Sequence, residues 1–245
     1  MSHLIVTIDT DWACEPAIEE TLDFLKDQQI SPTIFITHRS PAIEANLNEI
    51  EVGLHPYFDP NSSQGSTISE VVRHVMDLPH NLPAFRCHRF ANCNLSRQAM
   101  VEAGMLISSN VCTDMEVVLP FRDRFGLIEV PIFLEDGGYL WRKNPLELRP
   151  NLIEKIQGPG LKVLLIHPMH FAVNTPHFDY MYQIKKSVRQ EEWKNMTQST
   201  LNKHRWKGRG IRDLIIELLK NAPQISSMGA LMPSNIFSKQ HNSHE

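Results

Sequence analysis

The sequence predicts an α/β fold, a distorted or partly closed barrel of β/α units. Short apolar runs alternate with segments of helical periodicity along most of the chain, and this alternation implies parallel strands that are covered on both faces. The length of 245 residues and the hydrophobic content of 42% suffice for one large core. A doubly wound open sheet is the alternative that this pattern leaves open.

The expected strands are short runs rich in apolar and β-branched residues. The clearest of them is residues 162–166, which read KVLLI. The other expected strands, in chain order, are residues 4–8, 33–37, 52–55, 84–86, 106–108, 127–130 and 224–227.

The expected helices show apolar residues that recur on one face. Ile18, Leu22 and Leu25 follow the i, i+4, i+7 spacing after the first strand. Thr67 and Glu70 have the spacing of a capping box and predict the start of another helix. Further helices are expected at residues 41–47, 96–103, 152–156 and 211–219.

The chain is expected to form a single domain over residues 1–237, followed by a flexible polar tail at 238–245. We find no Gly- or Ser-rich linker and no internal repeat. Three stretches show little periodicity and are interpreted as long insertions, namely residues 109–126, 132–150 and 172–209.

Composition and charge exclude several classes of protein. The net charge of −4 argues against a nucleic-acid-binding protein. The four cysteines include no CxxC pair, which is typical of free thiols in a reducing compartment. The N-terminus has no basic signal region, and no apolar stretch is long enough to span a membrane. We therefore expect a cytoplasmic protein without a membrane span, and the sequence sets no oligomeric state.

The chain has 12 histidines, and several of them stand where expected strands end, together with acidic residues. In a β/α barrel the carboxyl ends of the strands meet on one face, where active sites are built. Carboxylates and imidazoles that meet there form a normal ligand set for Zn²⁺ or a similar divalent ion. The residues at these positions are Asp9, Asp11, His55, Arg86, His88, His167 and His170.

Four motifs at these positions, in this order, resemble those of the polysaccharide deacetylases, the NodB-homology group of carbohydrate esterase family 4. They read TIDTDW at 7–12, VGLHPYFD at 52–59, FRCHRF at 85–90 and LLIHP at 164–168. The Gly-Leu-His-Pro and Arg-Cys-His forms are most similar to the WbmS-like, lipopolysaccharide-biosynthesis branch. The resemblance spans roughly residues 4–171 and implies the partly closed barrel of that family.

The resemblance also implies a metal site. Asp11 and His55 are expected to bind a divalent metal, with zinc as the first choice. The family has a second histidine four residues after the first, and this chain has Asp59 there. The third ligand is therefore either Asp59 or His88. The family's fourth motif has two candidates, Glu129-Val130-Pro131 and Glu135-Asp136.

The implied reaction is hydrolysis of an N-acylated sugar or polysaccharide precursor during assembly of a surface polysaccharide. Asp9 would be the general base, Arg86 would hold Asp9 through a bidentate pair, and His167 would be the general acid. Backbone N–H groups near residues 56–58 are candidates for stabilising the oxyanion. We assign contacts to the substrate to Tyr57, Arg89, Asp136 and His170.

Other interpretations remain open at this point. The chain is alternatively a non-catalytic carbohydrate-binding descendant of the fold, or a metal-dependent hydrolase of another C–N bond. Asp59 also fits a simple turn. The basic stretch at residues 203–212 is interpreted as a solvated loop, with a grip on a phosphate as its alternative. Cys87 is interpreted as a small packing residue and not as a nucleophile.

Overall fold

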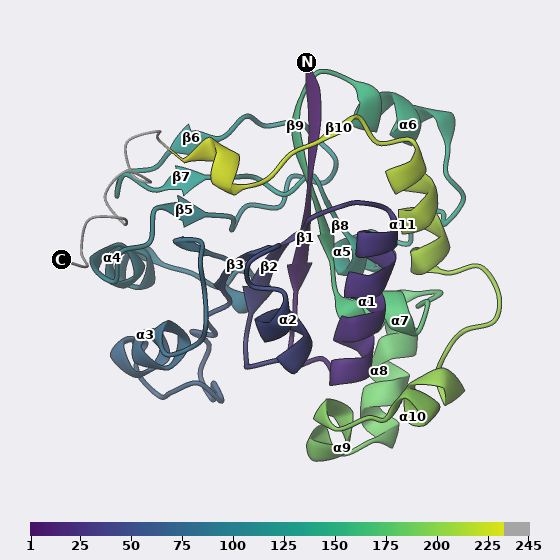
Figure 1. The fold of residues 1–245 in the computed structure, drawn as a ribbon, viewed down its shortest axis with the longest axis horizontal. Coiled ribbons are helices and arrows are strands. Elements are labelled where there is room, and N and C mark those ends of the chain that lie inside the picture. The colour runs from purple at the N-terminus through teal and green to yellow at the C-terminus, as the bar shows by residue number, and fades with distance from the viewer. Residues whose placement is uncertain (233–245) are drawn as a thin grey trace.

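One mostly parallel sheet organises the fold (Figure 1). The computed structural model describes residues 1–232, so the expected tail and the expected domain end at residue 237 lie outside the described residues. Within this part the strand order is β6-β7-β5-β4-β3-β2-β1-β9-β8, and β10 pairs with the first residues of β1. The strands are β1 (Ser2–Asp9), β2 (Thr33–Ile36), β3 (Glu51–Leu54), β4 (Ala84–Phe85), β5 (Ile107–Ser108), β6 (Phe121–Arg122), β7 (Ile128–Glu129), β8 (Leu134–Glu135), β9 (Gly160–Ile166) and β10 (Gln224–Ile225).

The sheet curls until its two sides approach each other. Strand β7 pairs with β5, and β8 pairs with β9, yet both belong to one extended stretch, residues 128–135. Between them, the N–H of Ile132 donates to the carbonyl of Val111 at 2.7 Å, and that of Phe133 donates to Val163 at 2.9 Å. This stretch therefore links both sides of the sheet and confirms the partly closed barrel over the doubly wound sheet.

Helices cover the outside of the sheet. In Figure 1, α1, α7 and α11 lie to one side of β1, and α3 and α4 lie to the other. The capping box of Thr67 and Glu70 at the start of α3 is confirmed. The α-helices are α1 (Glu15–Asp27), α2 (Pro41–Ala45), α3 (Ile68–Met76), α4 (Asn94–Glu102), α5 (Asp136–Trp141), α6 (Pro150–Gln157), α7 (Pro168–Ala172), α8 (Phe178–Ser187), α9 (Gln190–Lys194), α10 (Gln198–Lys203) and α11 (Ile211–Lys220), with 3₁₀ turns η1 (His88–Phe90) and η2 (Gly229–Leu231).

Two of the stretches without periodicity are more ordered than expected. Residues 132–150 contain β8 and α5, and residues 172–209 contain α8, α9 and α10. Most of these elements are only one or two turns long, and such short helices repeat too few times to display a period. These two stretches, interpreted from the sequence as long insertions, thus contain short elements that the sequence pattern did not reveal.

The alternation along β1 explains how a polar site forms inside an apolar barrel. Leu4, Val6 and Ile8 belong to the larger apolar cluster, which includes the buried faces of the helices. Ile5 belongs to the smaller cluster, with Phe35, Val163 and Leu165. Because side chains alternate across a strand, Thr7 and Asp9 share the face of Ile5. Polarity on that face thus increases toward the carboxyl end of β1.

Gly53 allows strands β3 and β4 to approach closely. A Cβ atom at Gly53 would lie 2.6 Å from the carbonyl oxygen of Ala84, which is too short for any side chain. The glycine therefore helps to set the position of His55, two residues later.

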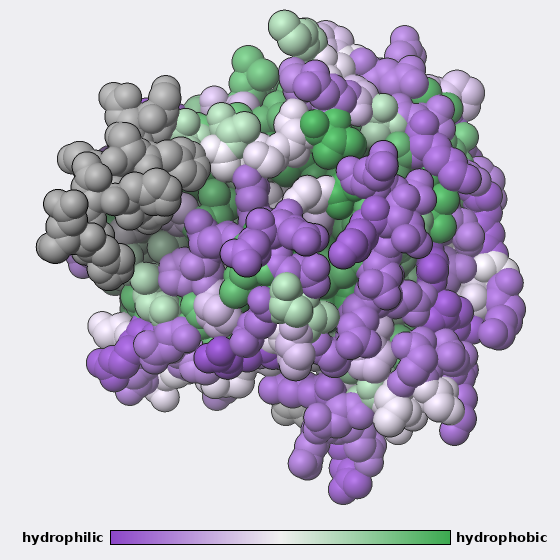
Figure 2. All heavy atoms as spheres, viewed as in Figure 1, coloured by the Kyte–Doolittle hydropathy of each residue, from purple (hydrophilic) through white to green (hydrophobic). Residues whose placement is uncertain are grey.

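Hydrophilic side chains cover most of the face shown in Figure 2, with smaller apolar areas between them. Among the described residues, no helix is both long enough and apolar enough to cross a membrane.

Candidate active site

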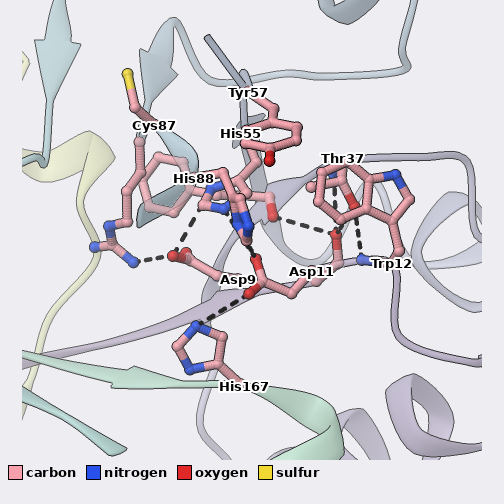
Figure 3. A network of polar contacts seen from close by, with 12 residues as sticks. Asp9, Asp11, Trp12, Thr37, His55, Tyr57, Cys87, His88 and His167 are labelled. Atoms are coloured by element: carbon pink, nitrogen blue, oxygen red, sulfur yellow. Dashed lines mark hydrogen bonds and ion pairs between the residues drawn. The ribbon is translucent and has the colours of Figure 1, made fainter. Parts of the chain in front are cut away.

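The structure gathers the predicted residues at the carboxyl ends of the strands. Asp9 is the last residue of β1, His55 directly follows β3, and His167 directly follows β9. Asp11 lies two residues beyond β1, and His88 begins η1. Figure 3 shows the carboxylates of Asp9 and Asp11 and the three imidazoles pointing toward one another.

A turn, and not an extended chain, carries Asp11 into this cluster. Asp11 and Trp12 have φ angles of 45° and 53°, a left-handed conformation that is uncommon for residues other than glycine. The N–H of Trp12 donates to the hydroxyl of Thr37 at 3.0 Å, and this hydroxyl lies 3.0 Å from that of Thr10. The two threonines therefore hold the turn that carries Asp11 into the cluster.

Asp11, His55 and His88 form a compact cluster of potential metal ligands. Oδ1 of Asp11 lies 3.0 Å from Nε2 of His55 and 3.0 Å from Nδ1 of His88. One ligand atom from each of the three residues lies within 4.8 Å of the others. One carboxylate and two imidazoles suit zinc and similar divalent ions.

The environment of His55 also fits a metal site. This side chain is 1% exposed, and within the described residues neither of its ring nitrogens has a partner in hydrogen-bond geometry, even though Asp11 is close. A buried imidazole nitrogen without a hydrogen bond is costly unless a ligand satisfies it. The residues present therefore fit a divalent ion.

The charge state of Asp11 is favourable for binding a cation. Burial raises the pKa of its carboxyl, but the imidazoles of His55, His88 and His167 outweigh this effect and hold the pKa well below its ordinary value. Asp11 is thus an anion at neutral pH.

Asp59 lies apart from the cluster. Its Oδ2 is 3.7 Å from Nη1 of Arg89, and it is absent from the set of ligand atoms that converge within residues 1–232. Of the two candidates for the third ligand, the structure places His88 next to Asp11 and His55, and turns Asp59 toward a cation.

Arg86 anchors Asp9 inside the barrel. This arginine is completely buried, and its Nη1 donates to Oδ1 of Asp9 at 2.8 Å and to the hydroxyl of Thr7 at 3.0 Å. Its Nε and Nη2 donate to the carbonyl and hydroxyl of Ser109 at 3.0 and 2.8 Å, and the guanidinium lies over the ring of Phe35. The predicted pairing is present, but it is not bidentate, because Ser109 occupies the other guanidinium nitrogens.

His167 is held by a buried carboxylate. Oδ1 of Asp136 lies 2.5 Å from Nδ1 of His167, and Oδ2 accepts the backbone N–H of the same residue at 2.7 Å. The other ring nitrogen, Nε2, lies 3.6 Å from Oδ2 of Asp11 and faces the cluster. Burial lowers the pKa of His167, but the charge of Asp136 and their hydrogen bond outweigh this and raise it to about 10.

This arrangement bears on two further expectations. Asp136, which we assigned to substrate contact, has no exposed surface and instead contacts His167. Of the two candidates for the fourth motif, Glu135-Asp136 reaches the site and Glu129 does not. Glu129 is buried elsewhere, where it accepts hydrogen bonds from Arg97, Ser108 and the N–H of Asn110.

Two adjoining hollows open beside the cluster. The larger has a volume of about 500 Å³ and is lined in part by His167, His170 and Trp141. The smaller, of about 360 Å³, is lined in part by Trp12 and Tyr57. Both include Asp11, His88 and Arg89 in their walls. Tyr57, Arg89 and His170 therefore lie where a bound molecule can reach them.

Gln64 is a buried residue of the site that the sequence pattern did not single out. It accepts the N–H of Tyr57 at 2.7 Å and donates to the carbonyl of His55 at 3.1 Å. It thereby fixes the turn after β3, and it occupies one of the backbone N–H groups that were candidates for an oxyanion site. No sequence pattern in its loop predicts this role. Thr37 and Ser109 also support the site, and their position as polar residues directly after strands could have identified them.

The arginines of the basic stretch at residues 203–212 form ion pairs within the protein. Arg205 and Arg212 both pair with Glu20, and Arg209 pairs with Glu217. These contacts agree with the interpretation as a loop. Cys87 is completely buried, and burial raises the pKa of its thiol, which makes it inert as a nucleophile.

The chain is similar to a known protein family and to solved structures. A family model described as WbmS-like polysaccharide deacetylase matches residues 6–185. The fold is similar to the crystal structure of WbmS from Bordetella bronchiseptica, a presumed polysaccharide deacetylase involved in O-antigen biosynthesis, with a TM-score of 0.77, 23% identity and 90% of each chain covered. A presumed polysaccharide deacetylase from Mycobacterium smegmatis gives a TM-score of 0.45 and 16% identity over 68% of this chain and 77% of the other. No curated protein matches the chain.

Proposed function

Because the chain belongs to the WbmS-like family of polysaccharide deacetylases, we propose that it is a metal-dependent hydrolase that removes an acyl group from an N-acylated sugar. Acetyl is the acyl group that we expect, and zinc is the ion. The relative from Bordetella bronchiseptica is described as involved in O-antigen biosynthesis, and we extend this role in surface-polysaccharide assembly to the present chain. That the reaction takes place in the cytoplasm stays a prediction.

The observation that carries the proposal is the position of Asp9 and His167 on the cluster formed by Asp11, His55 and His88. These three residues would hold a divalent ion, which would supply Lewis acidity toward the amide carbonyl and the attacking water. Asp59 is left out of this ligand set.

Asp9 is suited to accept the proton of the attacking water. Its Oδ1 is occupied by Arg86 at 2.8 Å, which orients the carboxylate. Its Oδ2 lies 3.8 Å from Nδ1 of His55, beyond hydrogen-bond distance, and remains open to a proton. One oxygen is therefore anchored while the other acts as the base.

His167 is suited to protonate the leaving amine. Asp136 holds its Nδ1 side, so that Nε2 is the nitrogen directed at the cluster. Because its pKa is raised to about 10, the ring carries a proton at neutral pH. An amine leaves as a neutral molecule only after it gains a proton, and His167 supplies it.

A carbohydrate-binding descendant without activity has no use for these two groups. The pair of Arg86 and Asp9 is buried, and Asp136 is buried against His167. Both arrangements remove charges from water, which is costly for a protein that only binds. Both pairs favour hydrolysis over binding alone.

Metal analysis of the purified protein tests the proposal first. We expect about one divalent ion per chain after incubation with zinc, and acetate release from N-acetylated sugars by the loaded protein. A protein that takes up no divalent ion would refute the hydrolase function. A protein that binds metal but releases acyl groups only from small non-sugar amides would favour the hydrolase of another C–N bond.

A further inference from the structure

Three cationic side chains line the smaller hollow beside the cluster. They are Arg89, Lys185 and Lys194, and the only acidic residue among the described residues lining that hollow is Asp11. The chain as a whole has a net charge of −4, whereas cations outnumber acids in the walls of this hollow. A concave site with excess charge of one sign concentrates ligands of the opposite sign.

The two lysines come from the stretch that the sequence left without a pattern. Lys185 lies on α8 and Lys194 ends α9. Within residues 1–232 neither amine has a carboxylate within ion-pair distance; Lys185 lies over the ring of Trp193 at 5.0 Å, and Lys194 lies over Trp12 at 5.9 Å. The aromatic rings keep both amines at the hollow without neutralising them.

The cations also converge on one another. Arg89 and Lys185 line both hollows, and Lys194 lines the smaller one with them. Arg89 itself has one carboxylate nearby, Asp59 at 3.7 Å. Like charges that share one hollow repel each other, and a bound anion would reduce this repulsion.

We propose that this hollow binds a diphosphate joined to the acylated sugar, so that the substrate is a diphosphate-linked sugar and not a neutral polysaccharide. The inference rests on the proposed function, because it takes the adjoining cluster as the place of acyl transfer to water. The carrier beyond the diphosphate is either a nucleoside or a lipid, and both present the same phosphate oxygens.

The number of charges favours a diphosphate over a sugar carboxylate. A divalent ion held at the cluster would offset the charge of Asp11, so that the three cations against the remaining carboxylate, Asp59, would leave two positive charges. A diphosphate diester carries about two negative charges at neutral pH, whereas a uronate carries about one. Arg89 offers the planar pair of donors that suits phosphate oxygens, and the lysines act as point charges. The hydroxyl of Ser63 and the amide of Asn61 lie in the same wall and add neutral donors.

Calorimetric titration of the full-length protein tests this assignment. The probes are inorganic pyrophosphate, uridine diphosphate and glucuronate. Each titration is repeated with a chelator present, so that no phosphate is bound through a metal at the cluster. We expect both diphosphates to bind in both conditions, and glucuronate to bind at least about tenfold more weakly. Tighter binding of uridine diphosphate than of pyrophosphate indicates a nucleoside carrier, and equal binding indicates a diphosphate recognised by itself.

The double variant K185Q/K194Q is expected to raise the Kd for pyrophosphate at least about tenfold. K186Q is the matched control, because Lys186 lies on the same helix but over the ring of Tyr182, outside the walls of both hollows. Its Kd should change less than about twofold.

Equal Kd values for the double variant and K186Q would overturn the inference, and so would glucuronate binding as tightly as pyrophosphate. Neither result would contradict the proposed hydrolase function, because metal uptake and acetate release are measured independently of these titrations. Conversely, a protein that binds diphosphate but takes up no metal would remove the hydrolase and leave the anion site standing.

Discussion

The buried carboxylate of Asp136 pairs with the partly exposed His167, and its Oδ1 lies 2.5 Å from Nδ1 of the imidazole. The acid begins α5 and the histidine follows β9, and the pairing of β8 with β9 brings these two strand ends together. The pair directs Nε2 of His167 toward Asp11 and raises the pKa of the ring to about 10.

Asp136→Asn is expected to narrow the pH range of activity on its alkaline side. Burial lowers the pKa of His167 and Asp136 raises it, so the neutral asparagine leaves the lowering effect in place. A general acid must be protonated, and its activity is lost as pH rises through its pKa. The alkaline limb of the kcat profile should therefore move to lower pH by about one unit or more. Asp27→Asn, at the exposed end of α1, is the control. An unmoved limb would show that His167 does not act as the acid.

Asp9→Asn should abolish most of the turnover while metal binding persists. Asparagine cannot take a proton from water, and general-base catalysis contributes about 10²–10⁴ in rate. Asp9 lies outside the set of potential ligands among residues 1–232, so the affinity for zinc should stay close to that of the wild type. Acetate release and zinc titration are measured on the same preparation. Equal rates for the variant and the wild type would remove Asp9 from the mechanism.

His55→Ala should lose metal and activity together. His55 contributes one of three converging ligands, and the loss of a ligand should weaken zinc binding by about 100-fold or more. His74→Ala removes an exposed imidazole from α3 and is the matched control, with unchanged metal content. Metal content by mass spectrometry decides the outcome. Full metal occupancy in His55→Ala would place the ion elsewhere.

His88→Ala and Asp59→Asn discriminate between the two candidates for the third ligand. His88 lies 3.0 Å from Asp11, whereas Asp59 lies beside Arg89. We expect His88→Ala to weaken zinc binding at least about tenfold and Asp59→Asn to leave it within about twofold. Competition with a zinc chelator gives both affinities. The reverse order would assign the third ligand to Asp59.

Arg86→Met should destabilise the fold through an unpaired charge. Arg86 is completely buried, and its removal leaves the carboxylate of Asp9 in the barrel without a partner. Breaking a buried ion pair costs about 3–5 kcal/mol of the free energy of unfolding. The double variant Asp9→Asn with Arg86→Met should regain part of this loss, because no charge is then left unpaired. Urea denaturation measures both. A loss of the same size in the single and double variants would mean that packing, and not charge, dominates.

Local pattern predicted much of the framework. The alternation of apolar runs and helical periods is confirmed by strands β1, β2, β3 and β9 and by helices α1, α3 and α11. Local pattern predicts these elements because each pattern is contained within one element, where the period of the backbone decides which side chains share a face. The positions of Asp9, His55 and His167 at strand ends followed from the same pattern.

The short elements escaped prediction for the same reason. Helix α9 spans only 5 residues, and α8 buries only Met181 and Ile184, so neither shows a clear apolar face in the sequence. They nevertheless place Lys185, Trp193 and Lys194 over the mouth of the barrel. Their position at the site depends on contacts with distant parts of the chain, which a local sequence period does not predict.

From the amino-acid pattern came most of the strands, the barrel as the first of two candidate folds, and the set of polar residues at the carboxyl ends of the strands. The tertiary structure alone decided which of them meet. It placed His88 against Asp11 across 77 positions of the chain, turned Asp59 toward Arg89, and buried Asp136 against His167. The physical reason is that contacts between distant residues are set by the curl and register of the sheet, which arise from the packing of all strands together.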